Sequence, residues 1–106
     1  MKNDDKILNE FVAAVHQHFD RKVKNIILFG SQARGDAEQN SDYDCLLIFD
    51  EVSPALVDTV DDITADFLYR YNVIFSAFPV SEANYKRQKY NPLFMNIRQD
   101  GISLRV

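Results

Sequence analysis

Two carboxylates separated by a single residue have the spacing of a divalent-cation site. Asp42 and Asp44 fall at alternate positions of a segment with strand character, so their side chains project from the same face of that strand. Carboxylates held side by side repel each other, and a hard cation such as Mg²⁺ removes that repulsion. Mg²⁺ characteristically takes one or two carboxylates and completes its coordination with phosphate oxygens and water. The pair therefore predicts a magnesium site whose other occupant is a nucleoside triphosphate.

A glycine and a serine upstream of this pair suit the triphosphate itself. Gly30 and Ser31 end a short apolar run, where a residue without a Cβ permits a sharp turn and the next backbone amides can point at an anion. Arg34 lies one helical turn beyond Ser31 and offers a charged fork to the same oxygens. The alternative for Arg34 is a surface arginine paired with Asp36 or Glu38. Gly30, Ser31 and Arg34 are thus the candidate nucleotide-binding residues.

The elements that must position these residues alternate between helix and strand. Apolar residues at steps of three and four predict a helix over 4–19, and β-branched runs predict strands over 23–29 and 42–49. The loop between these strands is too short for a long crossover helix, which favours antiparallel or mixed pairing. We expect an α/β (α+β) domain with a small mixed β-sheet flanked by helices. The remaining expected elements are a helix from the Ser53 cap and Pro54 to Arg70, a strand over 72–80, a short helix capped by Ser81, a helix from the Asn91 cap to Gly101, and a last strand over 102–106.

Length and composition narrow the classes of function. The 106 residues, with 46% hydrophobic content, predict one domain over 1–106. A net charge of −4 argues against broad nucleic-acid binding. The chain has no apolar run of membrane-spanning length and no secretory signal, so we expect a cytoplasmic protein without a membrane association. The single cysteine, Cys45, cannot form an internal disulfide and is expected to be a small core residue.

The spacing of these residues resembles a known signature. Gly30 and Ser31, ten intervening residues, and then Asp42 and Asp44 are similar to the motif of the DNA polymerase β-like nucleotidyltransferase superfamily. With the Ala-Arg-Gly string at 33–35, the segment resembles the minimal nucleotidyltransferase branch. The resemblance implies the polymerase β-like fold and transfer of AMP from ATP. It also implies that Gly30 and Ser31 hold the triphosphate, while Asp42 and Asp44 are the catalytic residues and bind two Mg²⁺ ions.

One residue of that family pattern is missing from this chain. Catalytic members typically have a third carboxylate on a neighbouring strand, yet the expected strand over 72–80 contains no Asp or Glu. Ser76 is its only small polar side chain, and a serine hydroxyl is a poor Mg²⁺ ligand and a poor base at neutral pH. Glu82 lies beyond the strand and reaches the site only in a different register. Catalysis is therefore a weaker expectation than binding of the nucleotide and metal.

Three functions stay open on the sequence. The resemblance implies an antitoxin that transfers AMP to a tyrosine of a partner protein, a HEPN-domain toxin. The missing carboxylate leaves open a catalytically impaired module that neutralises its partner by binding alone. Transfer to a small molecule such as an aminoglycoside is the third, although the chain has no separate substrate domain. The basic C-terminal quarter, with Lys86, Arg87 and Lys89, is a candidate partner surface, and a homo-oligomer is also open.

Overall fold

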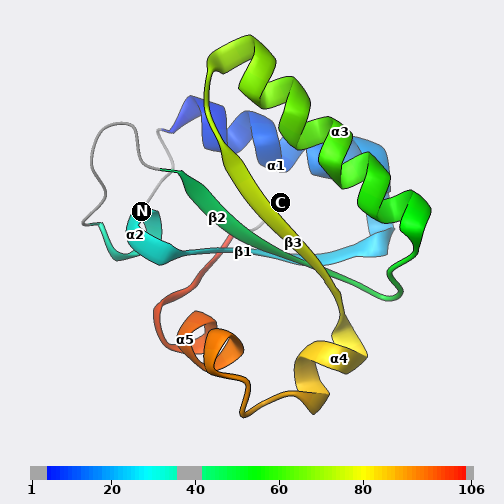
Figure 1. Ribbon diagram of the computed structural model, residues 1–106, viewed down its shortest axis with the longest axis vertical. Coiled ribbons are helices and arrows are strands. Elements are labelled where there is room, and N and C mark those ends of the chain that lie inside the picture. Colours follow the sequence, from blue (N-terminus) through cyan, green and yellow to red (C-terminus); the bar gives the residue numbers. More distant parts are fainter. Residues whose placement is uncertain (1–4, 36–41, 105–106) are drawn as a thin grey trace.

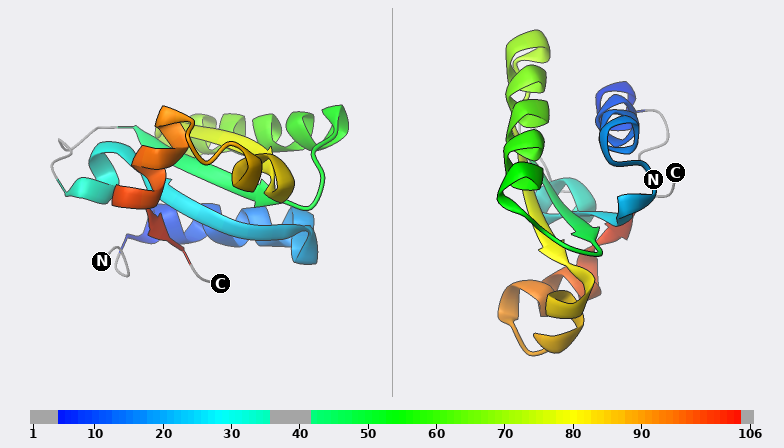
Figure 2. Two further views of the ribbon diagram at one scale, coloured as in Figure 1. Left: turned by 90° about the horizontal axis from the view of Figure 1, so that it is seen from below. Right: turned by 90° about the vertical axis from the view of Figure 1, so that its right-hand side faces the viewer.

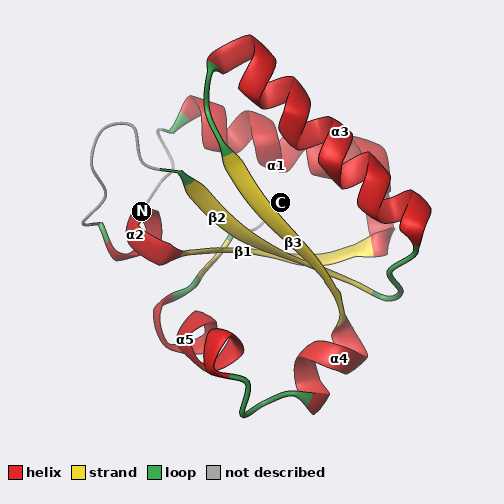
Figure 3. Cartoon of the chain, viewed as in Figure 1, coloured by secondary structure: helices red, strands yellow, loops and turns green. Residues whose placement is uncertain are grey.

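Four strands form one mixed sheet with helices on both of its faces (Figures 1 and 3). The computed structural model describes residues 5–35 and 42–104. The strand order is β3-β2-β1-β4; β1 is antiparallel to β2 and β4, and β2 is parallel to β3. The elements are α1 (Lys6–Phe19), a 3-10 turn (Asp20–Lys22), β1 (Val23–Phe29), α2 (Gly30–Arg34), β2 (Tyr43–Phe49), α3 (Pro54–Tyr71), β3 (Phe75–Ser81), α4 (Glu82–Arg87), α5 (Pro92–Asp100) and β4 (Ile102–Ser103).

Helices begin where the sequence provides side-chain caps. The Asp5 carboxylate accepts a hydrogen bond from the Leu8 amide at the start of α1, and the Ser53 hydroxyl accepts one from the Leu56 amide at the start of α3. Asn72 ends α3 in the left-handed conformation, with φ of 54°. These caps confirm the expected helix starts, since capping depends on residues close together in the sequence.

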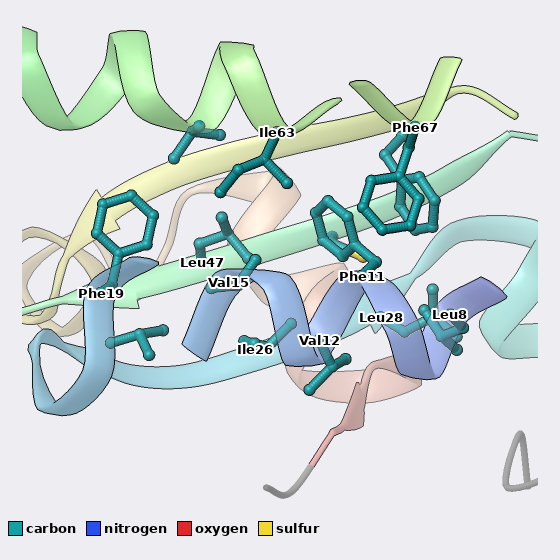
Figure 4. Close-up of a cluster of buried hydrophobic side chains, with 14 of the residues drawn as sticks. Leu8, Phe11, Val12, Val15, Phe19, Ile26, Leu28, Leu47, Ile63 and Phe67 are labelled. Carbon is teal, nitrogen blue, oxygen red and sulfur yellow. The ribbon is translucent and has the colours of Figure 1, made fainter. Parts of the chain in front are cut away.

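The first face of the sheet is covered by α1 and α3. Figure 4 shows the apolar side chains that fill the space between these helices and the strands. Phe11 of α1 stacks on Phe75 of β3, with ring centroids 4.0 Å apart, and Phe67 of α3 meets both rings edge-on at 5.5 Å. Buried aromatic rings in such pairs add to the stability gained from apolar burial. This core fixes the position of β3 against α1 and α3.

The second face is covered at one end only. A smaller cluster joins Ile27, Leu46 and Ile48 of the sheet to Phe94 and Ile97 of α5. Figure 2 shows α4 and α5 on the opposite side of the sheet from α1 and α3. The side chains that begin β2 and β3 on this face belong to neither apolar cluster, and it is here that the candidate site lies.

The strands differ from the sequence expectations mainly at their ends. The third strand begins three residues later than predicted, because α3 runs to Tyr71 and the left-handed Asn72 turns the chain before the strand starts. The last strand is shorter than predicted and comprises Ile102 and Ser103. β3 lies at one edge of the sheet, where a strand tolerates a proline such as Pro79. Over the described residues, no helix is both long and apolar enough to span a membrane.

Candidate functional site

The end of β1 and the start of β2 bring Gly30 and Asp44 into contact. Phe29 pairs with Asp44 in the antiparallel ladder, so Gly30 follows directly beside that aspartate. Gly30 has a φ of +73°, and a Cβ placed on it would lie 2.4 Å from Oδ2 of Asp44. Only a residue without a side chain therefore fits between the turn and the carboxylate.

A single helical turn follows this glycine. Ser31 is half-buried within α2, and Gln32 is buried at 7% exposure. Gly35 ends the helix in the left-handed conformation, and its amide donates to the Ser31 carbonyl at 3.1 Å. The first part of the connection between β1 and β2 is therefore a short helix. It places Ser31 immediately after the turn that contacts Asp44.

The charges of Asp42 and Arg34 both influence the carboxyl group of Asp44. Burial raises the pKa of Asp44 above its ordinary value, and the negative charge of Asp42 raises it further, while the positive charge of Arg34 lowers it. Asp42 is exposed just before β2, and Arg34 is exposed in the last turn of α2. The charges of Asp42 and Arg34 therefore both reach the carboxyl group of Asp44. The alternative partners of Arg34, Asp36 and Glu38, lie outside the described residues.

Ser76 occupies the strand position opposite Asp44. The parallel ladder between β2 and β3 pairs these two residues, and neighbouring strands are about 4.8 Å apart. β3 contains no Asp or Glu along its whole described length, which agrees with the missing carboxylate. Glu82 follows the far end of β3, about 20 Å from Ser76 along the strand direction, so it cannot complete the site. Within residues 5–35 and 42–104, no group of three His, Cys, Asp or Glu side chains is placed to hold a metal ion.

The two side chains next to Asp44 on β2 point to the other face. Tyr43 stacks on Phe75 at 4.8 Å, and its hydroxyl donates to Oδ2 of Asp5 at 2.5 Å. Cys45 is fully buried in the core, and burial raises the pKa of its thiol. Cys45 is therefore a core residue, as expected, and no nucleophile. The strand alternation leaves Asp44 alone of the three on the open face.

Sequence reasoning did not identify two aromatic residues that lie beside the site. Phe78 lies two residues beyond Ser76 on β3 and is 44% exposed. Its ring centroid is 6.0 Å from that of Phe29, the residue before Gly30. Strand alternation in the sequence could have placed Phe78 on the same face as Ser76. The register of β3 against β2, which only the structure gives, is needed to place Phe78 near Asp44.

Comparison with known sequences supports one family. The family model for the nucleotidyltransferase domain matches residues 8–94. The archaeal protein named "Putative protein adenylyltransferase MJ0604", from Methanocaldococcus jannaschii, is 33% identical over 99 residues, which cover 93% of this chain and 95% of the relative. A second protein of that organism, named "Putative protein adenylyltransferase MJ1305", is 35% identical over 96 residues, which cover 88% of this chain and 65% of the relative.

Solved structures agree with this match. "A putative nucleotidyltransferase from Sulfolobus solfataricus" is 26% identical, with a TM-score of 0.57 and coverage of 92% of this chain and 76% of that chain. A mutant of the toxin-antitoxin MntA-HpeT has the same fold, with a TM-score of 0.63 at 13% identity and coverage of 92% and 71%. The mixed sheet, the Gly30 turn and the match over 8–94 together show that the chain belongs to the nucleotidyltransferase domain family.

Proposed function

We propose that this chain transfers AMP from ATP to a hydroxyl group on a partner protein and that the transfer depends on Mg²⁺. The contact between Gly30 and Asp44 supports this most directly, because it joins the turn suited to phosphates to a carboxylate suited to the metal. Relatives named as protein adenylyltransferases, which match most of this chain, support a protein as the acceptor.

The residues present fit a magnesium site. Burial raises the pKa of Asp44, and the negative charge of Asp42 raises it further. A divalent cation bound between the two carboxylates would offset both the burial and the repulsion. A side chain at position 30 would fill the space beside Oδ2, which glycine keeps clear. Asp42 and Asp44 would hold two Mg²⁺ ions together with phosphate oxygens and water. When bound, such ions neutralise charge on the phosphates and favour the ionised form of the acceptor hydroxyl.

The other residues of the site orient the nucleotide. Ser31 and the amides of the Gly30 turn bind the β- and γ-phosphates, and Arg34 supplies a positive charge next to them. The acceptor oxygen forms a bond to the α-phosphorus as the bond from that phosphorus to the β-phosphate oxygen breaks. Pyrophosphate leaves, and the hydroxyl proton passes to solvent.

A toxin is the partner we favour. The structural neighbours include a toxin-antitoxin complex and a toxin-antitoxin solved with AMP-PNP, which match more than nine-tenths of this chain in fold. We propose that this chain is the antitoxin of a pair whose toxin has the HEPN domain, and that the modified hydroxyl belongs to a toxin tyrosine.

Labelling from α-³²P-ATP tests this function. The chain is incubated with Mg²⁺ and a lysate of cells that express a HEPN-domain toxin, and labelled protein is resolved on a gel. We expect one labelled band that disappears in the Asp42→Asn/Asp44→Asn variant and in EDTA. The matched control is Asp58→Asn/Asp61→Asn, which removes the same charge from exposed positions of α3. Labelling that persists without Asp42 and Asp44 would refute the proposal.

Ser76 favours a second candidate function. Because Ser76 stands opposite Asp44 and β3 contains no Asp or Glu, the chain would then bind its partner and the nucleotide without transfer. In that case no band is labelled, ATP still binds, and partner binding survives Asp44→Asn. The same labelling experiment, with a binding measurement beside it, separates the two functions.

A further inference from the structure

The layout of the site fixes the side from which an acceptor must approach. This inference rests on the proposed function. The Gly30 turn and α2 follow β1, Asp44 is on the central strand β2, and Ser76 is on the edge strand β3 (Figure 1). In phosphoryl-group chemistry the attacking and leaving oxygens lie roughly in line on opposite sides of the phosphorus. With pyrophosphate leaving toward Gly30 and α2, the acceptor oxygen enters from the β3 side.

The β3 side of the site carries an apolar strip. We call Ile74, Ser76 and Phe78 the β3 strip. Strand alternation places Ser76 and Phe78 on the face opposite Phe75 and Ala77, which pack in the main core, and Ile74 immediately precedes the strand. Ile74 is 48% exposed and Phe78 is 44% exposed. The strip is joined to the start of β2 by a hydrogen bond of 3.0 Å from the Tyr43 amide to the Ile74 carbonyl.

The strip also continues into the nucleotide side of the site. The ring of Phe78 contacts that of Phe29, which pairs with Asp44 and precedes Gly30. Exposed apolar residues scattered singly are ordinary, but these flank the in-register pair of Asp44 and Ser76. Their place beside the reacting centre, and not exposure alone, indicates a binding role.

We propose that the β3 strip binds the acceptor and that it selects an uncharged, apolar or aromatic segment of protein that presents the hydroxyl. Phe75–Ser81 contains no charged side chain. A polycationic acceptor such as an aminoglycoside would need carboxylates on that side to pair its ammonium groups, whereas an aromatic side chain can lie against Phe78 and Ile74. The strip therefore favours a tyrosine-bearing protein over a cationic sugar as the substrate.

Binding measured by NMR tests this without relying on turnover. The ¹⁵N-labelled full chain is saturated with Mg²⁺ and α,β-methylene-ATP, whose α–β bond cannot be cleaved in the reaction, and N-acetyl-tyrosinamide is then added. We expect the nucleotide to shift the amides of Gly30, Ser31 and Asp44, and the tyrosine amide to shift those of Ile74, Ser76 and Phe78. Kanamycin in place of the tyrosine amide is expected to leave the β3 strip unshifted.

Two variants sharpen the result. Phe78→Ser is expected to weaken binding of N-acetyl-tyrosinamide roughly tenfold. Leu68→Ser is the matched control, since Leu68 is 46% exposed on α3, over the other face of the sheet. Nucleotide shifts without tyrosine-amide shifts, equal binding by both variants, or kanamycin shifts in the strip would each overturn the inference. Absence of the nucleotide shifts would instead overturn the proposed function.

Discussion

The contact between Gly30 and Asp44 makes a pair of glycine substitutions informative. Gly30 and Gly35 both have left-handed backbones, with φ of +73° and +78°. A Cβ on Gly30 would lie 2.4 Å from Oδ2 of Asp44, whereas a Cβ on Gly35 would have no heavy atom within 4 Å. Gly30→Ala and Gly35→Ala therefore share the backbone strain, and only Gly30→Ala adds a collision with the site.

The sizes of the two effects follow from this geometry. Alanine in a left-handed conformation costs about 1–2 kcal/mol, so both variants should lose about that much free energy of unfolding. Ordinary van der Waals contact begins at 3.4 Å, so the Asp44 carboxylate must retreat by about 1 Å (3.4 minus 2.4) in Gly30→Ala. A misplacement of that size in a site that positions phosphates weakens function by up to about a hundredfold. We expect Gly30→Ala to bind Mg²⁺ with ATP about ten- to a hundredfold more weakly than Gly35→Ala.

Urea unfolding and calorimetric titration measure these two quantities separately. Unfolding at pH 7 gives the free energy lost by each variant, and titration with Mg²⁺ and α,β-methylene-ATP under folded conditions gives the affinity. Equal affinities for Gly30→Ala and Gly35→Ala would refute the reasoning, because the carboxylate would then not need its place beside the turn. A Gly35→Ala affinity well below that of the unmodified chain would show that the strain of a left-handed alanine alone disturbs the site.

Three further substitutions test the carboxylates and the opposite face of β2. Ser76→Asp adds a carboxylate opposite Asp44, so we expect Mn²⁺ to bind about tenfold more tightly by calorimetric titration; unchanged or weaker binding contradicts the assigned register. Burial and Asp42 raise the pKa of Asp44, so the folded protein holds this proton more tightly than the unfolded chain and ionised Asp44 opposes folding as the pH rises. In EDTA, Asp44→Asn should therefore raise the melting temperature at pH 7, with the gain vanishing as the pH falls below the ordinary value of 3.8; a lower melting temperature at pH 7 contradicts this. Tyr43→Phe removes the hydrogen bond to Asp5 and should cost about 1–2 kcal/mol in urea unfolding, with nucleotide affinity unchanged because the ring lies on the far face.

Local signals in the sequence were sufficient for much of the fold. The strand Val23–Phe29 has the predicted bounds, and the capping side chains of Asp5, Ser53 and Asn91 accept hydrogen bonds where the helices begin. The antiparallel pairing of β1 with β2 followed from the short connection between them. Each of these features depends on residues within a few positions of one another, which is why spacing alone could predict it.

Contacts between distant segments were beyond that reasoning. The register of β3 against β2 decides that Ser76 faces Asp44, and it is set by packing of Phe75 between α1 and α3. The hydrogen bond from Tyr43 to Asp5 joins residues 38 positions apart. The sequence assigned Gly30 a role toward phosphates, but its steric role toward Asp44 appears only when β1 and β2 are paired.

The small size of the domain makes one strand serve both the site and the core. On the second face of β2, the exposed end begins with Asp44, and two residues later Leu46 is fully buried against α5. Side chains on one face are about 7 Å apart along a strand, so the carboxylate of Asp44 lies next to the tightly packed side chain of Leu46. The rigidity that keeps Asp44 against Gly30 therefore comes from the same packing that stabilises the sheet. Repacking Leu46, which is buried against α5, should consequently alter the affinity for the nucleotide as well as the free energy of unfolding.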